Sequence, residues 1–176
     1  MGLMQLEAAL PGLQGLRLSV PDAIDWDGLE GELGFVFPVD YKILVESYAP
    51  FVISNLVHVF IPKPGFEDGY LGAVRDSLDY LEMDHDAGDV TEAPFREEGG
   101  LFPWATSSSG DTYYWRVVGG RTVAVVTQNR NYSFWEYSGG LADFLAGWCT
   151  ANVRPVGQPS LDDWGGPRAI RLTWAG

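Results

Sequence analysis

The chain has 176 residues, of which 24 are acidic and 11 are basic, so its formal net charge at pH 7 is −13. Its content of 46% hydrophobic and 20% charged residues is typical of a globular protein and excludes a disordered chain, a coiled coil and a collagen-like rod. No apolar run reaches the length of about 18 residues that a transmembrane helix requires. At this length we expect a single domain over residues 1–176.

The negative charge restricts the partners of the protein. Nucleic-acid and anionic-membrane surfaces would repel it, because a phosphate binder needs a basic footprint, whereas a basic protein would be attracted. Residues 67–98 carry 11 acidic and 2 basic residues, a net charge of −9. The single cysteine, Cys149, excludes an internal disulfide and a cysteine-based zinc site. With no signal-like N-terminus, these features predict a cytoplasmic protein.

Two helices are predicted in the first third of the chain. Asp25 is a suitable N-cap for the first, and Gly34 stands where a C-terminal glycine is expected. The second begins at Pro38 as its first helical residue. Its apolar face consists of Tyr41, Leu44, Val45 and Tyr48.

The middle of the chain predicts one strand, one helix and one loop. Alternating apolar residues indicate a strand over 55–61, and apolar spacing indicates a helix over 69–83. Residues 84–99 have many acids and no periodicity, so they are predicted to form a mobile loop.

The last part of the chain is rich in strand patterns. Strands are predicted over 101–105, at a sheet edge because of Pro103, and over 132–137. Gly119-Gly120 predicts a tight hairpin between 112–118 and 122–128. A closing helix capped by Ser138 and a Gly/Pro-rich extension over 155–176, with an edge strand over 169–174, complete the chain. Strands beside segregated helices predict an α+β fold with a mixed, mostly antiparallel sheet.

A turn at Ser109-Gly110-Asp111-Thr112 precedes the aromatic strand 112–118. We expect Gly110 to have a positive φ and the Asp111 carboxylate to accept hydrogen bonds from backbone N–H groups. Both residues therefore have predicted structural roles.

Catalytic and metal motifs are largely missing. Phosphate-binding glycine loops and GxSxG do not occur, and a serine of 107–109 would have to borrow His58 or His85 as its base. A half-buried strand histidine is the favoured interpretation of His58. The cluster beginning at Asp84 fails the EF-hand spacing, which needs Gly at position six and Glu at position twelve. The sequence thus predicts no catalytic residue, metal or cofactor.

The aromatic residues of the predicted strands allow two interpretations. They could stack sugars or peptides, but on alternating strands about half of such a set belongs to the core, which is the favoured interpretation. The set is Trp104, Tyr113, Tyr114, Trp115, Phe134 and Trp135. Cys149 is interpreted as an inert core thiol.

Two segments together resemble the SUKH superfamily, a group of cell-wall regulators and bacterial immunity proteins, over about residues 24–150. The sequence differs from the family pattern in Phe37 before the proline and in Ala49-Pro50 after the second helix. The resemblance rests on Trp26-x-x-Leu29-Glu30-x-x-Leu33-Gly34-x-x-x-Pro38-x-Asp40-Tyr41-x-x-Leu44-x-x-x-Tyr48, on Leu101-Phe102-Pro103-Trp104-Ala105 with Gly110-Asp111, and on Phe144-Leu145.

The resemblance implies a non-enzymatic protein-binding module. Its typical members neutralise a cognate toxin, often a nuclease, or act as regulatory or scaffold partners; a small-ligand-binding protein or enzyme is the third interpretation. A nuclease has a basic cleft that an acidic protein can occupy. We therefore expect a basic protein partner, such as a cognate toxin domain, and a monomer or weak dimer. The predicted partner-binding residues are Asp76, Asp79, Glu82, Asp84, Asp86 and Asp89.

Overall fold

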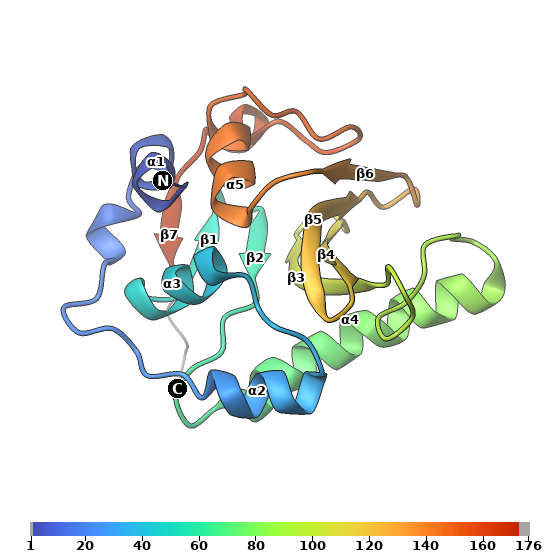
Figure 1. Cartoon of the computed structure of the whole chain (residues 1–176). Coiled ribbons are helices and arrows are strands. Elements are labelled where there is room, and N and C mark those ends of the chain that lie inside the picture. The colour runs from blue at the N-terminus through green and yellow to red at the C-terminus, as the bar shows by residue number, and fades with distance from the viewer. Residues whose placement is uncertain (1, 173–176) are drawn as a thin grey trace.

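The computed structural model describes residues 2–172 (Figure 1). The helices are α1 (Gly2–Ala9), α2 (Trp26–Leu33), α3 (Val39–Ser47), α4 (Glu67–Ala87) and α5 (Leu141–Cys149), with short 3₁₀ turns at Gln14–Leu16 and Leu161–Trp164. The strands are β1 (Phe51–Ile53), β2 (Val57–Val59), β3 (Leu101–Ser107), β4 (Thr112–Val118), β5 (Arg121–Gln128), β6 (Phe134–Tyr137) and β7 (Ala169–Arg171).

All seven strands form one sheet in the order β6-β5-β4-β3-β2-β1-β7. Every pair of neighbouring strands is antiparallel, and within residues 2–172 parallel contacts occur only as isolated bridges. The mostly antiparallel character of the predicted sheet is therefore confirmed, but the sheet contains no pair of parallel strands among these residues. The α+β fold with flanking helices is confirmed. None of the helices among the described residues combines the length and apolar character that a membrane span needs.

Both faces of the sheet are buried, and aromatic side chains of its strands contribute to the hydrophobic cluster on each face. On one face, Trp104, Tyr113 and Trp115 join the main core with side chains from α1, α3 and α5. On the other face, Tyr114 and Val126 form a smaller cluster, which Leu81 of α4 and Val90 complete. Alternation along the strands explains this division, because successive side chains point to opposite faces.

The local signals of α2 are confirmed. The Asp25 carboxylate accepts a hydrogen bond from the backbone N–H of Gly28 at 3.0 Å, and Gly34 ends the helix with a φ of 78°. The start of α3 differs by one residue, because Pro38 has an extended ψ of 136° and is the N-cap rather than the first helical residue.

The start of α5 is not capped by Ser138, as the sequence predicted. Gly140 is the N-cap, and the carboxylate of Asp40, at the start of α3, accepts a hydrogen bond from the backbone N–H of Ala142 at 2.9 Å. A carboxylate also interacts favourably with the positive end of the helix dipole. Asp40 therefore joins the N-terminal ends of two helices that are distant in sequence.

The strand predicted over 55–61 is confirmed only in part, as the shorter β2, and β1 before it was missed. β1 and β2 form a hairpin, and in the turn between them Ser54 and Asn55 have φ values of 56° and 53°. The sequence pattern hid the turn because apolar residues continue on both sides of it. Asparagine tolerates the left-handed conformation better than most residues, which makes the turn possible here.

Strand β3 lies at the centre of the sheet and not at an edge. Its proline is accommodated because the register between β3 and β4 shifts between Pro103 and Ala105. At this irregularity the indole Nε1 of Trp104 donates a hydrogen bond to the backbone carbonyl of Tyr114 at 3.0 Å. A local bulge thus allows a central strand to contain proline.

The remaining strand predictions are largely confirmed. Gly119 and Gly120 have φ values of 55° and 72° and form the tight turn between β4 and β5. β7 pairs with β1 as the predicted edge strand, although residues 173 and 174 lie outside the described residues. The separation into a family domain and an extension over 155–176 stays a prediction.

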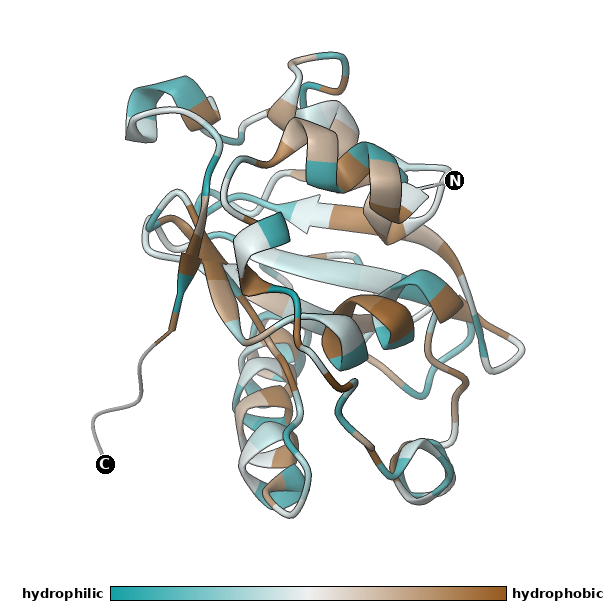
Figure 2. Ribbon diagram, turned by 90° about the vertical axis from the view of Figure 1, so that its left-hand side faces the viewer, coloured by the Kyte–Doolittle hydropathy of each residue, from teal (hydrophilic) through white to brown (hydrophobic). Residues whose placement is uncertain are grey.

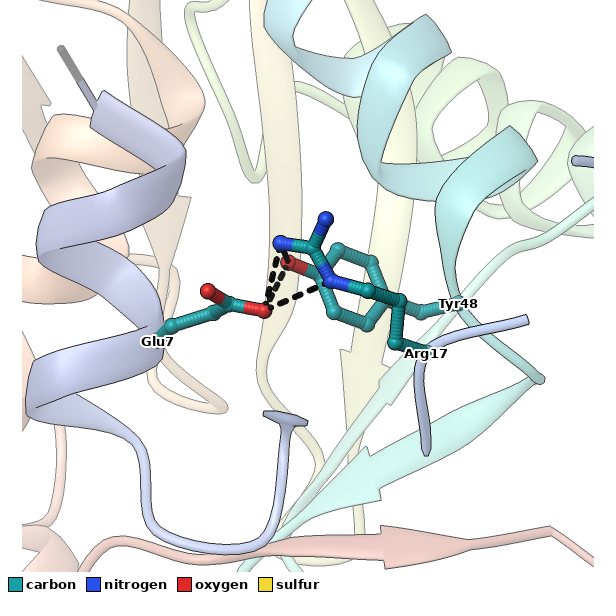
Figure 3. A network of polar contacts seen from close by, with 3 residues as sticks. All are labelled: Glu7, Arg17 and Tyr48. Atoms are coloured by element: carbon teal, nitrogen blue, oxygen red, sulfur yellow. Dashed lines mark hydrogen bonds and ion pairs between the residues drawn. The ribbon is translucent and has the colours of Figure 1, made fainter. Parts of the chain in front are cut away.

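A polar network fastens α1 to the end of α3 (Figure 3). The carboxylate of Glu7 accepts hydrogen bonds from Arg17 and from the hydroxyl of Tyr48, both at 2.7 Å. The Tyr48 hydroxyl, followed by the Arg17 guanidinium, lowers the pKa of the Glu7 carboxyl. The network holds the chain just before Ala49-Pro50, where the sequence departs from the family pattern.

Candidate partner-binding surface

One side of α4 packs against the rest of the fold, and the other side faces solvent. Its buried residues are Tyr70, Leu71, Val74 and Leu81. Figure 2 shows the helix projecting below the sheet, with hydrophilic and hydrophobic residues alternating along it. The outward side is therefore held in place by the packing of the inward side.

The helix is longer than the predicted 69–83, because it continues to Ala87 and includes Asp84 and Asp86. It ends at Gly88, which has a φ of 80° and donates its backbone N–H to the carbonyls of Asp84 and His85. The acidic residues made a helix end at Ala87 hard to predict, because acidic side chains in the last turn interact unfavourably with the helix dipole. Gly88 in the C′ position was the available signal.

The rest of the predicted mobile loop is attached to the fold. Arg116 of β4 donates hydrogen bonds to the Glu92 carboxylate and to the carbonyl of Gly99, both at 2.9 Å. The side chains of Val90 and Phe95 are buried. The loop is consequently packed against the sheet rather than free.

Five of the six predicted partner-binding residues are exposed, whereas Asp84 is half-buried and accepts a long hydrogen bond of 3.4 Å from the Tyr132 hydroxyl. Asp76, Asp79 and Asp86 recur at i, i+3 and i+10 and thus lie on one side of α4. Glu82 and Asp84 flank this side, and Asp89 follows the helix. None of the six carboxylates forms an ion pair within residues 2–172.

Two exposed apolar residues lie among these acids, although the sequence pattern did not indicate them as partner-binding residues. Tyr80 is 69% exposed and Met83 is similarly open to solvent. They occupy the same side of α4 as Asp76 and Asp79. We call these six acids together with Tyr80 and Met83 the acidic surface. It combines negative charge with apolar side chains, as protein-binding surfaces often do.

The same segment shows no sign of a metal centre. Within the described residues, no group of three or more histidine, cysteine, aspartate or glutamate side chains is placed to hold a metal ion.

At the predicted turn, Gly110 has a φ of 89° as expected. The partners of Asp111 differ from the prediction: its carboxylate accepts hydrogen bonds from the hydroxyls of Ser107 and Ser109, at 2.6 and 2.5 Å. The backbone N–H of Asp111 in turn donates to the Ser107 hydroxyl. Serine side chains thus take the place of the expected backbone donors.

Replacing Asp111 with alanine should lower the free energy of unfolding by about 1–2 kcal/mol, because two hydroxyl groups lose a shared acceptor. The side chain is only 4% exposed, so water replaces it poorly. Urea denaturation of Asp111→Ala, with exposed Asp89→Ala as control, measures the loss. An unchanged unfolding midpoint for Asp111→Ala would contradict the structural role.

His58 and the serine turn do meet, but not in a catalytic arrangement. The imidazole Nε2 of His58 lies 3.1 Å from the Ser108 hydroxyl, which itself donates to the carbonyl of Asn55. With the hydroxyl proton directed to that carbonyl, Nε2 acts as the donor to the serine oxygen. A general base requires the opposite direction of the proton. His58 is exposed rather than half-buried.

The aromatic residues proposed for stacking lie mostly in the core. Trp104, Tyr113, Tyr114 and Trp115 are buried, so they present no exposed ring to a sugar or peptide. Burial raises the pKa of the Cys149 thiol to about 12. At neutral pH this thiol is protonated and a poor nucleophile, as expected for an inert cysteine.

A model of the family described as SMI1-KNR4 cell-wall, SUKH_6, matches residues 25–145. No curated protein and no solved structure matches the chain. The matched range contains Asp40, the Gly110-Asp111 turn and all of α4. Because the match covers more than half of the chain, the protein belongs to the SMI1-KNR4 cell-wall family of the SUKH superfamily.

Proposed function

We propose that the protein is a non-enzymatic immunity protein that binds and neutralises a basic toxin in the cytoplasm. The observation that carries the proposal is the acidic surface of α4, whose carboxylates form no ion pair among the described residues. A family that includes immunity proteins supports it.

The acidic surface matches the chemistry of a nuclease toxin. An enzyme that cleaves nucleic acid binds phosphates through a basic cleft. Negative charges on a helix that projects from the fold can enter such a cleft and attract it over long distances. Tyr80 and Met83 add apolar contact area, which stabilises the complex after the charges have guided the encounter.

A regulatory or scaffold protein of the same fold is the alternative. It would use the same surface for a basic partner that is not toxic. A neighbouring reading frame that encodes a toxin favours immunity. Growth of cells that express the partner distinguishes the two functions, because only an immunity protein restores growth when it is co-expressed.

The acidic surface is tested by neutralising four of its charges in Asp76→Asn/Asp79→Asn/Asp84→Asn/Asp86→Asn. Surface plasmon resonance measures binding to the partner that co-purifies from the native host, at two salt concentrations. We expect slower association and a weaker salt dependence, because rim charges act mainly on the encounter rate. Screening is effective beyond a Debye length of about 10 Å at 0.1 M salt.

A matched control removes the same number of charges from exposed positions elsewhere: Asp27, Asp143, Asp162 and Asp163. If association depends only on net charge, both quadruple variants slow equally. An association rate and salt slope equal to those of the wild type in the α4 variant would exclude the acidic surface as the binding site.

A further inference from the structure

A second surface lies at the opposite face of the sheet from the smaller α4 cluster. It is a hollow of about 420 Å³ between the α2–α3 linker, the start of β5 and the loop before α5. Figure 1 shows this linker passing beside the hairpin end of β4 and β5, where Val36 bridges Arg121. We call it the valine hollow; its lining includes Val36, Val39, Arg121, Thr122, Val123 and Leu141.

The valine hollow is unusually apolar for a surface feature. Val36, Val39 and Val123 are 52%, 71% and 51% exposed, although they come from three different elements or turns. Exposed apolar side chains that gather around a depression commonly mark a binding site, whereas single exposed residues need no explanation.

Two polar groups of its lining lack partners. The indole Nε1 of Trp115 and the hydroxyl of Thr122 are buried and form no hydrogen bond within the described residues. Trp115 is fully buried, so its Nε1 is closed to an occupant, whereas Thr122 is half-buried and lines the hollow. An unpaired buried donor is costly, and a ligand that brings an acceptor removes that cost.

The edge of β5 is open beside the hollow. β6 pairs with β5 only from Val125 to Gln128, and Val36 bridges Arg121 at the other end. Residues 122–124 therefore have no ladder partner on this side among the described residues. The register shift against β4 makes Val123 a bulged residue. An open strand edge can pair with the main chain of another protein.

The charge of the valine hollow is opposite to that of the acidic surface. Among the described residues that line it, Arg121 is the only ionisable one. Arg121 is exposed and forms no hydrogen bond or ion pair with any other described side chain. The nearby Asp40 carboxylate is already engaged by the backbone N–H groups of Tyr41 and Ala142. In a chain of net charge −13, this site favours a neutral or acidic occupant.

We propose that the valine hollow binds an extended peptide segment of a partner protein, which pairs with residues 122–124 and inserts a large apolar side chain. An acidic residue of the segment contacts Arg121, and a peptide carbonyl accepts a hydrogen bond from the Thr122 hydroxyl. A peptide fits better than a free carboxylate ligand because it also satisfies the open strand edge. This site goes beyond the proposed function, since it selects acidic rather than basic partners.

The test uses a library of random heptapeptides displayed on phage, selected on the full-length protein and counter-selected on Val123→Glu. The enriched peptide is then synthesised, and its affinity is measured by calorimetry. We expect an apolar residue next to Asp or Glu, and an affinity that falls at least about tenfold in Val123→Glu. Val20→Glu changes a valine that is also exposed but does not line the hollow, and this variant should bind normally.

Two further variants test the chemistry. Thr122→Val keeps the shape but removes the hydroxyl and should weaken binding about threefold to tenfold. Arg121→Glu should bind the acidic peptide more weakly and should bind the peptide whose acidic residue is replaced by lysine more tightly. N-methylation of the peptide amides should abolish binding if the main chain pairs with β5.

The proposal is overturned if no peptide depends on Val123, or if Arg121→Glu shows no exchange of charge preference. Neutralising the four α4 aspartates should leave the peptide affinity unchanged. The experiments can therefore contradict the proposal for the acidic surface and the proposal for the valine hollow independently of each other.

Discussion

Replacing Trp104 with alanine should lower the free energy of unfolding by about 3–5 kcal/mol, the range measured for large aromatic residues in protein cores. Trp104 is fully buried and contacts the rings of Tyr113, Trp115 and Phe144, with centroids 5.4 to 6.3 Å away. Its Nε1 also bonds the Tyr114 carbonyl beside the bulge of β3. The variant loses packing and a buried hydrogen bond at the centre of the sheet.

Such a loss is large against the total stability of about 5–15 kcal/mol that a domain of this kind has. Chemical denaturation of Trp104→Ala measures it, and Trp104→Phe separates the hydrogen bond from the ring packing. Tyr80→Ala removes an exposed aromatic residue and should change stability by less than about 0.5 kcal/mol. A loss below about 1 kcal/mol in Trp104→Ala would contradict its central role.

Features with a local cause were predictable from the sequence. Asp25 and Gly34 determine the ends of α2 through bonds within a few residues, and Gly119-Gly120 forms its turn without help from the rest of the fold. The burial of Tyr41 and Leu44 follows from the helical spacing. These signals depend on neighbours in the chain, so the structure confirms them.

Features with a distant cause were missed. The cap of α5 comes from Asp40, 102 residues before Ala142, and no local pattern indicates it. The central position of β3 depends on how strands from distant segments pair, and a bulge overrides the usual effect of Pro103.

The two candidate surfaces also differ in how far the sequence could predict them. Composition located the acidic surface, since charge is visible without a fold, but the helical placement of Asp84 and Asp86 needed the packing of Leu81 and Val90. The valine hollow was not predictable. Its three exposed valines are separated by up to 87 residues in the sequence, and each one alone resembles an ordinary surface or strand residue.

The two surfaces also place different demands on a partner. The acidic surface attracts positive charge over a long range, whereas the valine hollow offers apolar contact, an open strand edge and one cation. A partner that satisfies only one of them leaves the other free. On the two proposals together, the protein would bind two partners at once, or one partner with a basic domain and an acidic strand-forming segment.

The second large effect expected is unfolding in alkali, caused by buried tyrosines. Burial is the main cause that raises the pKa of five phenols: Tyr41, Tyr48, Tyr70, Tyr113 and Tyr114. For Tyr48 burial, with the hydrogen bond to Glu7 as the second cause, raises the pKa to about 12. In the unfolded chain these groups titrate near pH 10.

The direction in which the free energy of unfolding changes with pH follows from proton binding. Between about pH 10 and the raised pKa, the folded protein keeps protons that the unfolded chain has lost, so the free energy of unfolding falls as the pH rises. The stabilisation is complete below about pH 10 and is lost above it, by about 1.4 kcal/mol for each buried phenol and each pH unit. Because several such groups act together, the loss over about one to two pH units is comparable with the total stability of about 5–15 kcal/mol that a domain has.

Circular dichroism and the ultraviolet absorbance of tyrosinate, followed together in an alkaline titration, check this result. We expect the buried tyrosines to ionise in the same cooperative step in which the secondary structure disappears, because they gain access to water only on unfolding. Tyr80→Phe, which alters an exposed phenol, should unfold at the same pH as the wild type. Ionisation of all eight tyrosines near pH 10 with the fold intact would contradict the burial of these phenols.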